Sequence, residues 1–317
     1  MAKIIRQRGS PRARLWCSAG FPAFRIPQRA IMLVLIGAVL AGYRQPQPAT
    51  AHADLIERIE RLTVDIGRQP QAAELRLQRA EIYRQHAQFE EALADVDEAA
   101  RLRADARIIH LAKARVLSDA GQTTNALAAV EKLLAVEPGH PEAVLIRARC
   151  RMKINLVAAA VEDFTVALTK IKTPEPDLFL ERAHAQAAIG QLGSAIGGLD
   201  DGMARIGAVP QLQLAAIEFE RQRTNHAGAL IRLDKIIARQ PVKEPWLVLR
   251  GEVLEQANQP GDAREVFRRA LAGIEAYPPA RRNLDLTRQL ETRARDGVAR
   301  AEEKLRNPST ITPPKSS

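Results

Sequence analysis

The stretch RAEIYRQHAQFEEALADVDEAARL, residues 79–102, decides the fold. It carries small residues at Ala80, Ala92 and Ala99, separated mostly by charged and large apolar side chains. The first two recur 34 and 68 positions later, at Ala114, Ala126, Ala148 and Ala160. Similarity at a fixed interval is the signature of a repeat architecture, so these intervals bear on the fold of the whole chain.

The 34-residue period runs through most of the chain. The third small position continues as Ala99, Leu133 and Ala167. After one extra residue near KTPEP the period resumes with Ala183, Ala195, Gly202, Ala229, Gly251, Ala263 and Ala270. We therefore place six repeats, numbered 1 to 6, at residues 73–106, 107–140, 141–174, 176–209, 210–243 and 244–277.

Small residues at positions 8, 20 and 27 of each repeat, with Pro138 or Pro241 at position 32, resemble the tetratricopeptide repeat family. The resemblance implies an all-α, right-handed superhelical solenoid of about six helix-turn-helix repeats. The family's large first-helix residues are mostly replaced, with only Tyr83 kept, and Ile217 stands where a small position-8 residue belongs.

Packing explains the pattern. Two antiparallel helices come close only where the facing side chains are small, while larger side chains fill the space between them. We expect the filling positions to be Val96, Val130, Phe164, Leu199, Leu233 and Phe267. The ends of such a stack need caps. Residues 54–72 are expected to form an N-terminal capping helix, 278–306 a C-terminal one, and 307–317 a disordered Pro/Ser tail.

The first 53 residues have the features of a targeting leader. Residues 30–43, AIMLVLIGAVLAGY, are uncharged but shorter than the ~20 residues that a membrane span needs. Ala51 and Ala53 match the small residues before a signal-peptidase site, which predicts cleavage before Asp54 and export, most simply to a bacterial periplasm. A membrane-anchoring signal and a mitochondrial presequence remain alternatives.

The net charge of +10 belongs mostly to this leader. Eight of the 47 Lys and Arg residues precede Asp54, which leaves 39 basic against 37 acidic residues. We therefore expect no nucleic-acid partner and, once the leader is removed, no membrane span. Of the two cysteines, Cys17 lies in the leader, and Cys150 is expected to pack as a small apolar residue.

Catalytic and cofactor motifs are missing from the sequence. It has no GxSxG, P-loop, GxGxxG or HExxH pattern and no Cys/His metal spacing. His86 with Glu90 and Glu91 is better explained as a turn followed by an acidic helix start than as a metal site. We expect no catalysis and no cofactor, and the glycine-rich stretch 190–207 is expected to mark close packing or a weak helix.

Position 7 is basic in five repeats, at Arg79, Lys113, Arg147, Arg182 and Arg250. We expect the stems to pack between repeats and the heads to reach water or carboxylates such as Glu74 and Glu142. A ladder for an anionic partner is the alternative.

The family resemblance also implies a binding groove. In the family, positions 2, 5, 9 and 12 of the first helix line the concave face. Position 5 is here an apolar row, and position 9 is basic or histidine in the middle and acidic at the ends. The predicted groove residues are Leu77, Leu111, Leu145, Leu180, Leu214 and Val248 at position 5, and Glu81, Arg115, Arg149, His184, Glu218 and Glu252 at position 9.

From this groove we predict a protein-binding scaffold of the cell envelope, monomeric or part of a hetero-complex. Its partner is expected to be a protein or peptide segment with apolar anchors and an acidic residue opposite Arg115 and Arg149. The alternative is a structural component of a larger envelope complex that uses lateral edges or the C-terminal helix.

Overall fold

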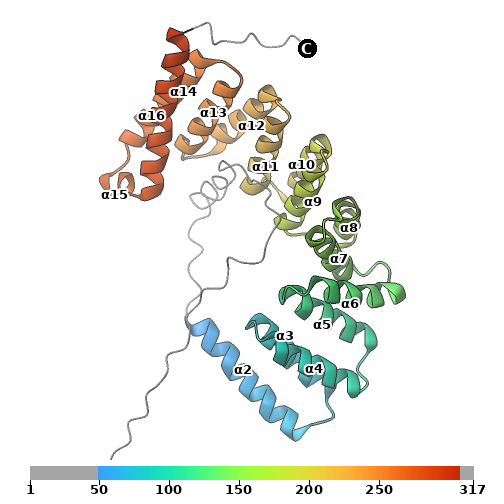
Figure 1. The fold of residues 1–317 in the computed structure, drawn as a ribbon. Coiled ribbons are helices and arrows are strands. Elements are labelled where there is room, and N and C mark those ends of the chain that lie inside the picture. Colours follow the sequence, from blue (N-terminus) through green and yellow to red (C-terminus); the bar gives the residue numbers. More distant parts are fainter. Residues whose placement is uncertain (1–48, 308–317) are drawn as a thin grey trace, which may run out of the picture.

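The computed structural model describes residues 49–307, which form fifteen helices and no strand (Figure 1). The predicted tail from 308 and all of the predicted leader before Ala49 lie outside the described residues. The bounds are α2 Ala49–Arg68, α3 Ala73–Gln85, α4 Phe89–Arg101, α5 Ala106–Asp119, α6 Thr123–Val136, α7 Pro141–Lys153, α8 Val157–Lys170, α9 Pro176–Ala188, α10 Leu192–Ile206, α11 Pro210–Gln222, α12 His226–Arg239, α13 Glu244–Gln256, α14 Pro260–Glu275, α15 Pro279–Arg282 and α16 Asp285–Arg306.

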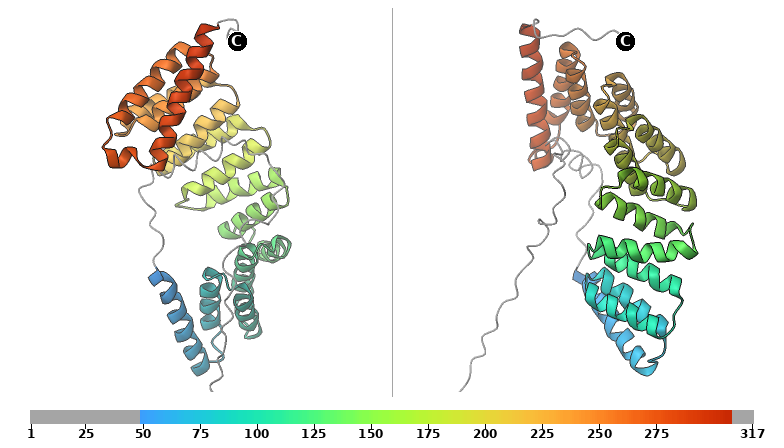
Figure 2. Two further views of the ribbon diagram at one scale, coloured as in Figure 1. Left: turned by 60° about the vertical axis from the view of Figure 1, so that its left-hand side comes forward. Right: turned by 45° about the vertical axis from the view of Figure 1, so that its right-hand side comes forward.

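Six helical hairpins, from α3/α4 to α13/α14, stack side by side into a curved superhelix (Figures 1 and 2). From α3 to α11 the first helix of each hairpin lies toward the inside of the arc, and the second helix lies outside it (Figure 1). The predicted all-α solenoid is confirmed. None of the described helices is long and apolar enough to cross a membrane.

Small side chains stand at the crossings of the helices, as the period predicts. Position 20 is an alanine in all six repeats, and its side chain is fully buried: Ala92, Ala126, Ala160, Ala195, Ala229 and Ala263. The predicted filling residues are also buried, from Val96 to Phe267. The approach is tight at Gly251, where an added Cβ would lie 2.6 Å from the Phe267 ring.

The turn inside each hairpin has one backbone feature that the sequence does not reveal. Position 15 has a positive φ in all six repeats, at Ala87, Gly121, Asn155, Gly190, Thr224 and Asn258. Glycine and asparagine suit this left-handed conformation, whereas a β-branched residue such as Thr224 is disfavoured there. Four of the six residues are not glycine, so packing of the hairpin must impose the conformation.

The basic residue at position 7 joins helices, and its carboxylate partners differ from those expected. Arg79 donates two hydrogen bonds of 2.7 Å to Asp95, at position 23 of the same repeat, and Arg147 pairs likewise with Asp163. Other pairs reach back to position 25 of the preceding repeat: Lys113–Asp97, Arg147–Glu131 and Arg250–Asp234. The partners therefore lie on second helices, and neither Glu74 nor Glu142 is among them.

Repeat 4 lacks these carboxylates. Gly198 occupies its position 23, and Arg182 donates only to the carbonyl oxygen of Gly198, at 3.3 Å. Burial lowers the pKa of this guanidinium.

The glycine-rich helix α10 is continuous. Gly202 allows close packing, because an added Cβ would lie 2.8 Å from Phe179. The prediction of close packing is met at Gly198 and Gly202, whereas Gly193 and Gly197 are exposed.

The two ends of the stack differ. Helix α2 packs on α3 as the second helix of a repeat packs on the next first helix, but it starts at Ala49 rather than at the expected residue 54. At the other end, the segment expected as a single helix is broken into α15 and α16. Helix α16 buries Ala294, Gly297 and Ala301 against the last hairpin and leaves a charged outer face.

Cys150 is buried, and burial raises the pKa of its thiol. The residue therefore packs as the small apolar side chain that the sequence predicts.

The buried Asp163 provides a test of the position-7 ties. Its carboxylate is 3% exposed and accepts hydrogen bonds from Arg147 and from Arg151. Asp163→Ala removes the buried carboxylate that Arg147 and Arg151 share and leaves them only the more distant and more exposed Glu131, at 3.5 and 3.9 Å. We therefore expect urea unfolding, followed by circular dichroism, to show a loss of about 3–5 kcal/mol in the free energy of unfolding. Asp234→Ala is the control, because its pair with Arg250 is exposed and is expected to contribute less than about 1 kcal/mol. Equal effects of the two substitutions would contradict this assignment.

Candidate functional site on the concave face

The predicted apolar row at position 5 divides into two parts. Leu77, Leu111, Leu145 and Leu180 are half-buried, packed against the core with part of each side chain exposed. Leu214 and Val248 are only 4% and 0% exposed. The accessible apolar row therefore extends over the first helices of repeats 1 to 4, which we call the open groove: the concave faces of α3, α5, α7 and α9.

The C-terminal cap accounts for part of this division. Val248 belongs to the buried cluster that includes Ala294 and Ala301 of α16. Arg293 of α16 pairs with Glu252 at 2.7 Å, and Arg300 pairs with Glu255 at 2.8 Å. Helix α16 thus occupies the place that a seventh first helix would take. Leu214 is covered differently, because it packs into the cluster around Trp246 and Leu249 of α13.

Polar side chains tie neighbouring first helices together along the concave face. Arg84 bonds to Asp119, Arg115 to Glu142, and Arg149 to Glu181, the last at 2.9 Å. Arg221 donates to Gln256 at 2.9 Å. Between α9 and α11 a ring contact takes the place of a charge, with 5.4 Å between the centroids of His184 and Phe219. We call this series of contacts the concave ladder.

The contacts of the concave ladder reduce the number of free charges that the position-9 residues present to a ligand. Arg115 and Arg149 are half-exposed, but each guanidinium already holds a carboxylate of the next helix. Glu81 is held by Arg84, whose hydrogen bonds keep the pKa of Glu81 below its ordinary value. Glu218 is held by Arg221. The charges are therefore largely satisfied within the protein.

His184 differs from the other members of position 9. Its imidazole can still be reached by water, and it contacts Phe219 edge-on. The protein surrounding it on the concave side desolvates the ring and lowers its pKa. Near neutral pH His184 is thus an uncharged hydrogen-bonding group at the end of the open groove.

Two features of this surface were not predicted from the sequence: the exposure of Ile108, and the pairing of Glu142 and Glu181 with the position-9 arginines. Ile108 of α5, at position 2 of repeat 2, is 53% exposed and adds an apolar contact beside the leucine row. Glu142 and Glu181 neutralise the central arginines. Both carboxylates lie near the starts of first helices, 27 and 32 residues after their partners. That spacing is a signal for neighbouring first helices once the period is known.

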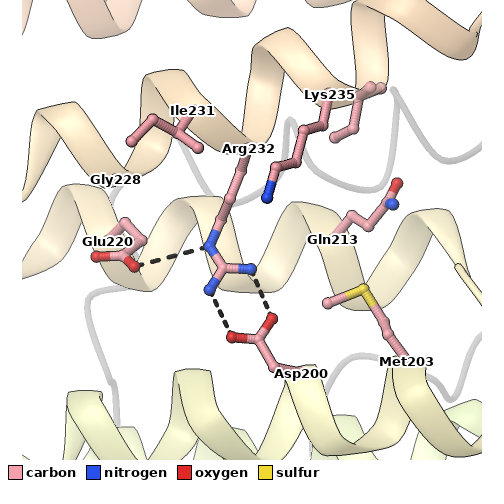
Figure 3. A pocket seen from close by; sticks show the side chains of 9 residues that line it. Asp200, Met203, Gln213, Glu220, Gly228, Ile231, Arg232 and Lys235 are labelled. Atoms are coloured by element: carbon pink, nitrogen blue, oxygen red, sulfur yellow. Dashed lines mark hydrogen bonds and ion pairs between the residues drawn. The ribbon is translucent and has the colours of Figure 1, made fainter.

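The described residues form two larger clefts, of which only the first borders the open groove. One, of about 570 Å³, opens between α2 and α3 and is lined by Arg58, Arg61, Leu62, Asp65, Leu77, Gln78, Glu81, Ile82 and Gln85. The other, of about 440 Å³, lies between α10, α11 and α12 (Figure 3). Across this cleft the guanidinium of Arg232 donates two hydrogen bonds of 2.7 Å to the carboxylate of Asp200, and its Nε lies 3.7 Å from a carboxylate oxygen of Glu220.

Within residues 54–307 no cluster of His, Cys, Asp and Glu side chains could hold a metal ion.

Comparisons with known proteins agree with this geometry. A tetratricopeptide repeat family model matches residues 111–176, which span α5 to α8 and the start of α9. No curated protein sequence matches the chain.

Solved structures extend the similarity beyond those residues. The C-terminal part of a repeat-containing protein from Cytophaga hutchinsonii is 14% identical, with a TM-score of 0.59 over 78% of this chain and 96% of that one. A tetratricopeptide repeat protein from Parabacteroides merdae is 18% identical, with a TM-score of 0.48 over 78% and 94%. At such identities the Cytophaga hutchinsonii structure shows the fold alone. Residues 111–176 thus match the tetratricopeptide repeat family, and the stack as a whole has the tetratricopeptide repeat fold.

Proposed function

We propose that the protein is a non-catalytic binding module whose open groove holds a segment of another protein. The observation that carries the proposal is the row of part-exposed leucines from Leu77 to Leu180, with Ile108 beside it. Proteins with this repeat are in general interaction modules. A curved row of apolar side chains on rigid helices suits an elongated partner segment.

The concave ladder supports apolar anchoring of the partner. An acidic partner residue would have to displace Glu142 or Glu181 before it could bind Arg115 or Arg149, and that exchange gains little. Apolar side chains meet no such competitor at Leu111 and Leu145. We therefore assign affinity to the leucine row and alignment of the partner to the polar ladder on each side.

We further propose that the chain is exported and works in the cell envelope. The support is the leader: an acid-free basic segment, the apolar residues 30–43, and small residues before Asp54. A chain that begins at Asp54 would lose only the first residues of α2 and would keep every helix of the six hairpins.

Site-specific photo-cross-linking in cells tests the groove. A photoreactive residue at Ile108 is expected to give one discrete protein adduct, and the same residue at Val136 is expected to give none. Both side chains are exposed, at 53% and 69%, but Val136 ends the second helix α6. With the partner identified, Ile108→Asp should weaken its binding at least tenfold by calorimetry, about 1.4 kcal/mol, and Val136→Asp should leave it unchanged. Equal adducts at both positions would rule out the groove.

Mass spectrometry of the mature chain tests export. Purification from the envelope fraction of the native cell is expected to yield a chain that starts at Asp54. An intact leader on a chain recovered from the cytosol would overturn the proposal.

A further inference from the structure

The cleft between α2 and α3 lies where the repeat pattern requires a helix that is missing from the described residues. When the 34-residue period is extended backward, a preceding repeat would cover residues 39–72. Its second helix is α2. The cleft residues Arg58, Leu62 and Asp65 then occupy positions 20, 24 and 27, where every complete repeat carries the side chains that face its own first helix.

The residues on the α3 side of the cleft also occupy positions that would face a preceding first helix. They are Leu77, Gln78, Glu81, Ile82 and Gln85 of α3, at positions 5, 6, 9, 10 and 13. In some later repeats these positions contact the preceding first helix: Glu181, at position 6, holds Arg149, and Asp119, at position 13, holds Arg84. The cleft is therefore bounded by the two helices, α2 and α3, that a preceding first helix would contact.

We propose that this cleft is the docking site for a single amphipathic helix of a partner protein, which completes the first hairpin of the stack. Its apolar residues would cover Leu62 and Leu77. An acidic residue would meet Arg58, which has no ion pair among residues 54–307, and a basic residue would meet Glu74, as Arg115 meets Glu142.

The charges at the cleft distinguish this site from an ordinary repeat crossing. Position 20 is alanine and position 27 is small or aliphatic in all six repeats, whereas these positions are here Arg58 and Asp65. Large charged side chains prevent the close backbone approach found inside a repeat, and they add a charge pattern that a ligand must match. The site therefore selects its helix by charge as well as by apolar contact.

Two other occupants fit less well. The chain's own residues in this register include Pro46 and Pro48, at positions 8 and 10, and proline disfavours a helix interior. Helix α16 of a second copy would present its free face, which carries Arg288, Arg295, Asp296 and Glu303 and lacks the apolar row that Leu62 and Leu77 require.

A charge-swap experiment with a synthetic helix tests the proposal. The probe is a labelled peptide of residues 106–119, the sequence of α5, which is itself the first helix of a repeat. At position 8, opposite position 20, Ala114 is replaced by Glu in one peptide and by Lys in the other. Fluorescence anisotropy on the purified protein is expected to show at least tenfold tighter binding of the Glu peptide.

The matched variant reverses the preference. Arg58→Glu is expected to favour the Lys peptide by a similar factor, and because Arg58 is exposed its replacement should leave thermal unfolding unchanged. Ile108→Asp should bind both peptides as the wild type does, which separates this site from the open groove. Three results would each overturn the proposal. The first is that neither peptide binds at millimolar concentration, and the second is that Arg58→Glu leaves the preference for the Glu peptide unaltered. The third is that light scattering shows a dimer that blocks peptide binding.

Discussion

Each hairpin of this protein depends on the close approach of two helices, which only alanine or glycine at the crossing allows. Five repeats meet the condition at position 8, and repeat 5 breaks it, because Ile217 is buried there. Helices α11 and α12 pack against each other less extensively than the helices of any other hairpin. The cleft between α10, α11 and α12 borders this loosened hairpin (Figure 3). The large side chain of Ile217 thus lies in the hairpin whose two helices pack least closely.

The ion pairs between first and second helices also change at repeat 5. In repeat 3, Arg147 and Arg151 on the first helix hold Asp163 on the second. Repeat 5 inverts this arrangement: Glu220 lies on the first helix and Arg232 on the second, and Arg232 reaches back to Asp200 of repeat 4. The buried core is also divided inside α11, where Ala216 and Phe219 belong to the cluster of the preceding repeats and Leu214 and Ile217 to the following one. The break in the core and in the charge pairs therefore falls inside repeat 5, at α11.

Much of the fold can be predicted from the 34-residue period, because each position makes the same local contacts in every repeat. Positions 20 and 24 could be assigned from sequence, since each meets the same neighbour in every repeat. The accessible part of the groove could not be assigned, because the burial of Val248 depends on how the distant α16 folds against the last hairpin. The partners of Arg115 and Arg149 were missed for a related reason: one charged residue does not show which of several carboxylates its helix will face. The left-handed turn residues Ala87 and Thr224 carry no local signal.

Hydrogen exchange measured by mass spectrometry, repeat by repeat, tests most directly whether the small-residue crossings govern this stack. Amides in a close-packed hairpin exchange only when that hairpin opens, so protection reports local stability. We predict that the amides of α12 exchange faster than those of the equivalent second helices α6 and α8, and that Ile217→Ala reduces this difference in exchange rate. Equal protection of α12, α6 and α8 in the wild-type protein would contradict this prediction.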